Sequence, residues 1–228
     1  MSIPQHLIRL LLLPVLLIAC KETTPPRIDL AKLNLNEKVR TLVHYDNRVW
    51  AGVNTVETLP AIVVEVRPSS AYSFNGISLD STEVIFQLNS PTFRKDTSMH
   101  NGVGQYVGTR VKSNKALDSV INSYKADSAI YGYRIGVKTA QMQAHILKEL
   151  IKLYGPGTKN PNTDHGLYWN LKDKQRLILY APDYDRLIVL NTNNLSKTCY
   201  QDNMNGVIDL GGCNIDQYFD ELYFRKKL

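Results

Sequence analysis

Runs of apolar residues with the spacing of strands and helices alternate along most of this chain. Apolar, β-branched runs bounded by proline, glycine or asparagine predict strands. The clearest run covers residues 61–67 and lies between Pro60 and Pro68. The same pattern predicts further strands at residues 72–79, with Asn75-Gly76 as a turn or bulge, and at 83–88, 105–111, 129–137, 167–171, 175–181 and 186–191.

Two segments have the spacing of amphipathic helices. In the first, apolar or aromatic side chains recur at positions 117, 120, 121 and 124, after a cap at Ser113 or Asn114. The second begins after Thr139 and keeps its apolar residues on one face. It ends at Gly155 and Pro156, the residue types expected at and just past a C-cap.

Weaker patterns predict two more helices. Residues 29–45 fit a helical stripe in part. Residues 214–225 have Asn214 as a cap and Asp216 in the first turn, where negative charge is favourable. Between the strands, residues 89–104 are polar and contain Pro91, which predicts a loop.

Together these elements predict an α+β fold, a mainly antiparallel sheet with two to four helices packed on it. We expect a single globular domain at residues 29–228, with a candidate sub-division near residue 112. Within residues 139–191, the order of a helix, Tyr154-Gly155-Pro156, Tyr168-Trp169 and a hairpin resembles small outer-membrane assembly lipoproteins of the β-lactamase-inhibitor-like fold.

The first 19 residues have the pattern of a targeting segment. Arg9 is followed by nine apolar residues, 10–18, with Pro14 among them. Crossing a bilayer takes about 20 apolar residues, so this run is too short to span. Its length suits the apolar core of a signal peptide.

The run ends in Leu17-Ile18-Ala19-Cys20, which resembles the lipobox of bacterial lipoproteins. The resemblance implies cleavage before Cys20 and attachment of diacylglycerol, with further acyl chains such as palmitate, to that residue. Residues 20–28 would then form a lipidated tether. Lys21 and not aspartate follows the cysteine, and by the resemblance to enteric lipoproteins this implies an outer-membrane address in the cell envelope.

The net charge is mildly basic and spread along the chain. There are 27 basic and 21 acidic side chains, and removal of residues 1–19, with Arg9, leaves 26 − 21 = +5. The densest basic run, residues 225–227, is typical of a solvated tail. We therefore expect no nucleic-acid partner.

Two cysteines remain besides the anchor. Cys199 and Cys213 lie seven residues before and after Gly206, and Asn205-Gly206 is a strong hairpin signal. A hairpin there would bring the two thiols together in an oxidising compartment. The spacing predicts a disulfide, with two buried free thiols as the alternative.

No arrangement of residues predicts catalysis, a metal or a cofactor. Asp164 and His165 are sequence neighbours, which rarely form a catalytic pair, and His145 with Glu149 is typical of a helix-stabilising pair. Residues 201–209 resemble part of an EF-hand loop, but position one is Gln201 and the strong carboxylates are missing. A polar cleft with convergent carboxylates, or a His–Asp contact, would favour an enzyme.

Aromatic residues are the remaining candidates for a binding site. Tyr168, Trp169, Tyr180 and Tyr184 lie on neighbouring predicted strands and turns and could stack on a glycan. Tyrosine and tryptophan also fill cores, which is the alternative interpretation. We expect a non-enzymatic envelope lipoprotein, anchored in the membrane, that binds a protein or another envelope component. The alternatives are a small-ligand or glycan binder and, third, a hydrolase of unfamiliar type.

Overall fold

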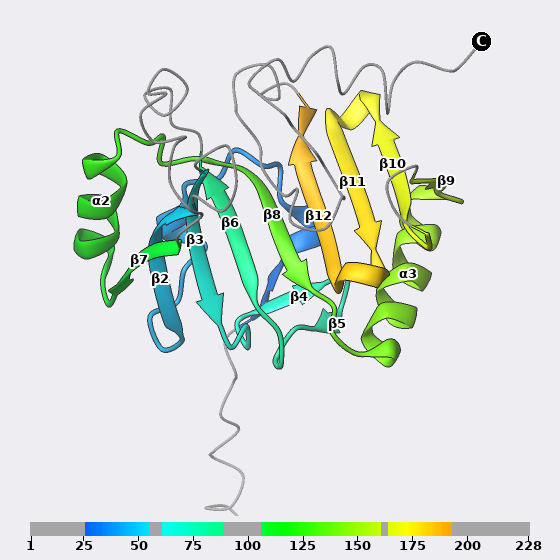
Figure 1. The fold of residues 1–228 in the computed structure, drawn as a ribbon, viewed down its shortest axis with the longest axis horizontal. Helices are drawn as coiled ribbons and strands as arrows, with labels where there is room; N and C mark the ends of the chain where they lie inside the picture. The colour runs from blue at the N-terminus through cyan, green and yellow to red at the C-terminus, as the bar shows by residue number, and fades with distance from the viewer. Residues whose placement is uncertain (1–25, 55–60, 89–105, 161–163, 193–228) are drawn as a thin grey trace, which may run out of the picture.

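One sheet of nine antiparallel strands dominates the molecule (Figure 1). The computed structural model describes residues 26–54, 61–88, 106–160 and 164–192. The strand order is β7-β2-β3-β6-β8-β12-β11-β10-β9, and each neighbouring pair is antiparallel. The strands are β2 (Arg48–Asn54), β3 (Ala61–Arg67), β6 (Val84–Leu88), β7 (Tyr106–Val111), β8 (Ile130–Gly136), β9 (Thr158–Lys159), β10 (Leu167–Leu171), β11 (Arg176–Ala181) and β12 (Arg186–Asn191).

A second, three-stranded sheet lies behind the first (Figure 1). It contains β1 (Ile28–Asp29), β4 (Tyr72–Phe74) and β5 (Ile77–Ser78). Asn75 and Gly76 have φ angles of 45° and 86°, so the predicted turn joins two short strands. Tyr72 and Phe86 pack edge to face with ring centroids 5.7 Å apart, which ties the small sheet to the large one.

Both helices predicted from strong periodicity are confirmed. In α2 (Asn114–Ser123) the Ser113 hydroxyl accepts from the Ala116 amide, and in α3 (Ala140–Tyr154) Thr139 accepts from Met142, each at 3.2 Å. These capping bonds satisfy amides that have no partner within the helix. The described residues thus contain two α-helices, while the helix predicted at residues 214–225 lies outside them.

The helix predicted at residues 29–45 is wrong. The segment holds β1 and two 3₁₀ turns, η1 (Leu30–Lys32) and η2 (Val39–Thr41). Its amides bond to distant residues, as in the 2.8 Å bond from Val39 N to Ser128 O. The apolar spacing is irregular because these leucines and valines pack into one core from a backbone that is not helical. The buried side chains are Leu30, Leu33, Leu35, Val39, Leu42 and Val43.

The two faces of the large sheet have different surroundings. The core face packs on the helices, the small sheet and the 3₁₀ turns, through residues such as Val66, Ile135 and Leu187. The outer face turns toward the viewer in Figure 1, and no described helix lies on it. It carries Leu177, Leu179, Ile188 and Leu190, which are also buried. Both faces of β11 and β12 are therefore shielded from water, as their continuous apolar sequences indicate.

The predicted fold class, a mainly antiparallel sheet with helices, is confirmed. The seven strands of the large sheet expected from residues 61–67, 83–88, 105–111, 129–137, 167–171, 175–181 and 186–191 are all present. β2 and the short β9 were not expected. β6 pairs with β8, so strands from both sides of residue 112 belong to one continuous sheet.

Candidate functional site

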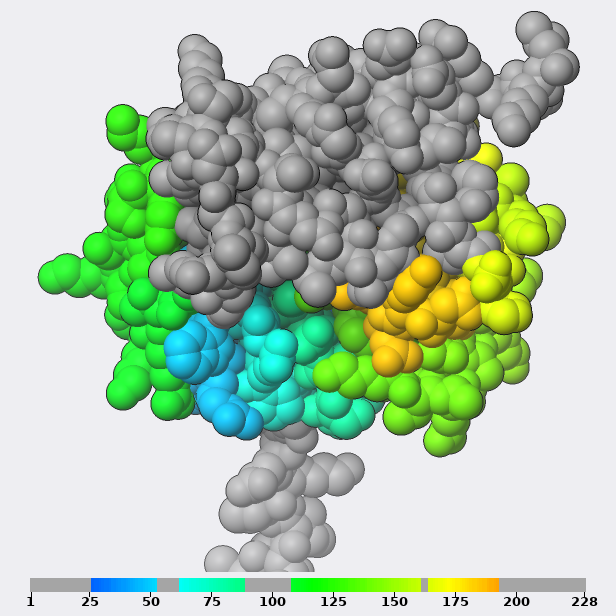
Figure 2. Space-filling view, in the orientation of Figure 1, coloured from blue at the N-terminus to red at the C-terminus, as the bar shows by residue number. Residues whose placement is uncertain are grey.

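A pocket on the outer face lies at the β7-β2-β3 end of the sheet. It has a volume of about 510 Å³ and is lined by Arg48, Trp50, Glu65, Arg67 and Gly108. We call it the Trp50 pocket. The surfaces of β2 and β3, blue to cyan, lie side by side on this face of the molecule (Figure 2).

Strand geometry explains why these five residues meet. Side chains two apart on a strand share a face, so Arg48 and Trp50 project together from β2. In the antiparallel register Arg67 lies opposite Arg48, and Glu65 lies opposite Trp50. Gly108 on β7 lies opposite Gly52 and places no side chain over the pocket.

A network of charged side chains borders the pocket. Arg67 forms an ion pair with Glu65 through Nε, and its Nη2 lies 2.6 Å from Glu83 Oε2. Arg134 and Lys138 lie 3.9 and 4.0 Å from the Glu83 carboxylate. The two glutamate side chains are 10% and 14% exposed, so their charge is largely withdrawn from water and held by the three cations.

Burial raises the pKa of the Glu65 carboxyl, and repulsion from Glu83 acts in the same direction. Arg67, Arg134 and Lys138 oppose the increase without cancelling it. The Glu65 carboxylate has lost most of its hydration, and its ion pair does not fully replace it. A hydrogen bond from a polar ligand would therefore stabilise this carboxylate.

The four aromatic residues predicted to bind a ligand do not form one surface. Trp169 and Tyr180 face the core, where Trp169 Nε1 donates to Gly155 O at 2.8 Å and Tyr180 Oη donates to Gln143 O at 3.1 Å. Burial raises the pKa of Tyr180 to about 12. Tyr168 alternates with Trp169 and lies on the outer face, and Tyr184 lies in the turn η5 (Pro182–Tyr184). The core interpretation therefore holds for Trp169 and Tyr180.

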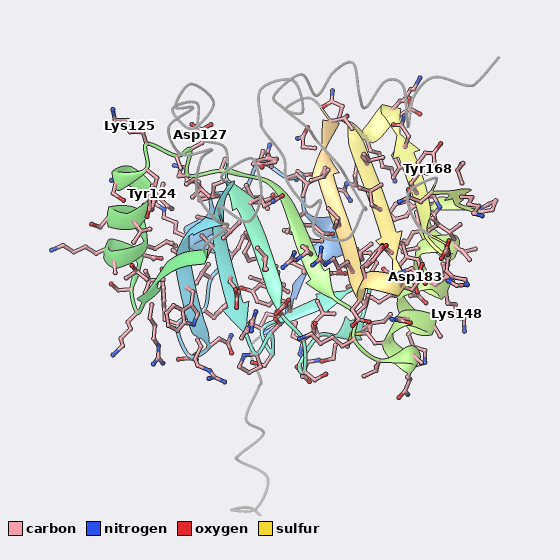
Figure 3. All side chains as sticks on the ribbon, in the orientation of Figure 1. Tyr124, Lys125, Asp127, Lys148, Tyr168 and Asp183 are labelled. Atoms are coloured by element: carbon pink, nitrogen blue, oxygen red, sulfur yellow. The ribbon has the colours of Figure 1, made fainter. Side chains whose placement is uncertain are left out.

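His165 contacts an aspartate, although not its sequence neighbour Asp164. Its Nδ1 lies 2.6 Å from Asp183 Oδ1, and its amide donates to Asp183 Oδ2 at 2.9 Å. Asp183 and Tyr168 lie at the β9–β11 end of the molecule, far from β2 and β3 (Figure 3). The imidazole is 77% exposed and these contacts join two loops, so the pair clamps the η5 turn, and neither residue lines the Trp50 pocket.

The expected pair between His145 and Glu149 is wrong. Glu149 Oε2 accepts from Asn75 Nδ2 at 2.6 Å and lies 3.4 Å from Lys152 Nζ. The helix carboxylate therefore holds the β4–β5 turn against α3. Sequence spacing could not show this contact because Asn75 is 74 positions away.

Several predicted sites lie outside the described residues. They are the anchor Cys20, the pair Cys199 and Cys213, and the EF-hand-like residues 201–209. Within the described ranges, no group of three histidine, cysteine or acidic residues could hold a metal ion. Nor does any described helix have the length and apolar character needed to cross a membrane.

Sequence reasoning missed every residue of the Trp50 pocket. β2 does alternate, since Val49, Ala51 and Val53 would share one face, but Gly52 interrupts the β-branched pattern. A second signal was Glu65, a charged residue within the apolar run 61–67. A buried charge needs a partner, so this position indicated a polar site.

Comparison with protein-family models, with curated proteins and with solved structures finds no match.

Proposed function

We propose that this chain is a lipid-anchored, non-enzymatic binding protein of the bacterial cell envelope, with its ligand bound in the Trp50 pocket. The observation that carries the binding role is the 36% exposed Trp50 side chain among Arg48, Arg67 and Glu65. Ligand sites typically combine aromatic surface with a few charged groups in a concave space.

The size and shape of the site favour a small ligand or glycan over a protein. A volume of about 510 Å³ falls in the range of small-molecule pockets. A protein partner would need a larger contact surface, of about 800 Å² on each side.

The proposed anchor rests on the pattern that ends at Cys20. Two or more acyl chains hold a protein stably in a bilayer, whereas one chain binds marginally. Within the expected tether, residues 20–28, the six residues 21–26 reach about 20 Å when extended. An outer-membrane position would therefore keep the pocket close to the envelope surface.

Two variants test the anchor and the binding site separately. Cys20→Ala should release the full chain from membranes and abolish palmitate labelling. Trp50→Ala should stay anchored but lose binding on an array of bacterial and plant glycans. Tyr184→Ala, an aromatic substitution in the η5 turn, is the matched control. Equal binding by Trp50→Ala and the unaltered chain would refute the site.

A second candidate, a glycan hydrolase, is favoured by Glu65 and Glu83. The two carboxylates converge on Arg67, and a raised pKa is typical of a general acid. Their shared partner Arg67 argues against this role, because the guanidinium favours the ionised carboxylates and a general acid must hold a proton to donate. A reducing-end assay on the glycans that bind in the array distinguishes the two functions. New reducing ends that form with the unaltered chain but not with Glu65→Gln would establish a hydrolase.

A further inference from the structure

We propose that the Trp50 pocket selects an acidic glycan, a sugar ring that carries a carboxylate, which it places against Arg48. This inference rests on the binding role proposed above and names the ligand class. Four features of the described residues support it: an unpaired guanidinium, an exposed indole, a glycine-lined floor and a buried carboxylate.

The first feature is an uncompensated positive charge. Arg48 and Arg67 lie directly opposite each other on β2 and β3. Like charges in this arrangement repel and destabilise the strand pair. Arg67 is neutralised by Glu65 and Glu83, whereas Arg48 has no ion pair with a described residue. A ligand carboxylate beside Arg48 would supply the missing counter-charge in a bidentate geometry.

The second feature is the setting of Trp50. It lies two residues beyond Arg48 and directly opposite Arg110, which is exposed and has no ion pair with a described residue either. The indole is thus a partly exposed apolar surface with an arginine position on either side, Arg48 along β2 and Arg110 across on β7. The apolar face of a sugar ring can pack on the indole while its charged group reaches an arginine.

The third feature is space beside the indole. Gly52 and Gly108 lie opposite each other, two positions beyond Trp50 on the same face. A side chain at either position would stand next to the ring. Gly108 lines the pocket there and adds no side chain to it.

The fourth feature excludes a simple polyanion. Glu65 lies in the same pocket, opposite Trp50, and its side chain is 10% exposed. Its carboxylate repels a second negative charge but accepts hydrogen bonds from hydroxyl groups. The two sides of the pocket therefore differ: the side at Arg48 is cationic, and the side at Glu65 accepts hydrogen bonds from hydroxyl groups. This pattern suits a ring with one carboxylate and several hydroxyls.

The test uses the full chain in detergent and two probes, oligomers of galacturonic acid and of glucuronic acid. Their methyl esters have the same rings without the charge. Tryptophan fluorescence and calorimetry give the dissociation constants. We expect at least one acidic oligomer to bind about tenfold more tightly than its ester, the ratio that one charge-assisted contact produces.

Variants locate the contact. Arg48→Gln should weaken binding of the acidic oligomer by about tenfold, flatten its salt dependence and leave binding of the ester unchanged. Arg40→Gln is the matched control, since Arg40 lies in η2 and its nearest carboxylate, that of Asp118, is 4.0 Å away. Both arginines are exposed, so circular dichroism should show intact folds.

The outcomes separate this inference from the binding role. If the acidic oligomer and its ester bind equally, and Trp50→Ala loses both, the acidic ligand is refuted and the binding role is kept. Competition by inorganic phosphate or sulfate at the same concentration would show that an anion alone suffices, which also overturns the inference. Failure of every glycan to bind would refute both.

Discussion

Glu65 and Asp183 show how strongly the surroundings of one carboxylate determine its effect. Glu65 is buried in the sheet, and burial raises its pKa even with Arg67 beside it. Asp183 lies at an exposed turn, and hydrogen bonds from the amide and imidazole of His165 lower its pKa. The two groups therefore contribute to stability with opposite dependence on pH.

For Asp183 the sign follows from a folded-state pKa below the unfolded value. The ionised carboxylate stabilises the fold above the ordinary aspartate pKa, and this contribution disappears as the pH falls through the lowered folded-state pKa. At about pH 6, Asp183→Asn should lower the melting temperature. The free energy of unfolding should fall by less than about 1 kcal/mol, because the pair is exposed. The difference from the unaltered chain should vanish once the pH falls below the lowered folded-state pKa.

Glu65 should show the opposite dependence on pH when the melting temperature of Glu65→Gln is measured in the same way. Its folded-state pKa lies above the unfolded value, so the protein loses stability as the pH rises from the unfolded-state pKa to the folded-state pKa. Glu65→Gln should therefore gain stability relative to the unaltered chain as the pH rises above the ordinary glutamate pKa of about 4.3. A parallel response of the two variants to pH would contradict these assignments.

Among the elements, α3 depends on its ends as well as on its apolar stripe. Ile146 and Leu150 fix its buried face, Thr139 caps its start, and Gly155 ends it with φ 77° and ψ −172°. This backbone conformation is almost exclusive to glycine. The Gly155 amide still donates to Ile151 O at 2.8 Å, so the helix keeps its last hydrogen bond.

Gly155→Ala should destabilise the protein by about 1–3 kcal/mol through backbone strain alone. A Cβ at this position would have no atom within 4 Å, so no steric contact contributes. Gly157→Ala provides the comparison, since its Cβ would meet the Trp169 ring at 2.7 Å. Denaturant unfolding should show both losses, and only Gly157→Ala should also perturb Trp169 fluorescence.

The elements that sequence predicted and those that it missed differ in where their hydrogen bonds go. α2, α3, β11 and β12 follow local periodicity and tight turns, so their patterns are readable from neighbouring residues. The segment that follows β1 satisfies its backbone by contacts such as Ile130 N to Glu37 O, which no local pattern reveals. The Trp50 pocket depends on which residues of β2, β3 and β7 lie opposite one another. That register is a property of the assembled sheet.

Across the whole molecule, Arg176 joins the N-terminal segment to the sheet. From β11, its Nη1 donates to Ala31 O at 3.1 Å, and Nη2 donates to Leu33 O. Tyr133 adds a bond of 2.9 Å from its hydroxyl to Leu30 O. Residues 30–33 are thus fixed to the centre of the fold.

Arg176→Lys should loosen this attachment, because an ammonium group cannot reproduce the two-pronged guanidinium contact. Hydrogen exchange should accelerate in residues 28–35 while that of α2 stays unchanged. Lys174→Arg, on the neighbouring exposed turn η4 (Lys172–Lys174), is the control and should have no effect. Uniform acceleration over all described elements would instead indicate general destabilisation.

The two edges of the nine-stranded sheet determine whether copies of the protein can pair with one another. The proposed lipid anchor would bring copies together at high local density, where unpaired strand edges favour sheet-to-sheet aggregation. Here one edge is β9, two exposed residues ending in Lys159, and the other is β7, which presents exposed Arg110. Short or positively charged edges resist such pairing. Crowded copies should therefore remain separate molecules and not grow into a continuous sheet.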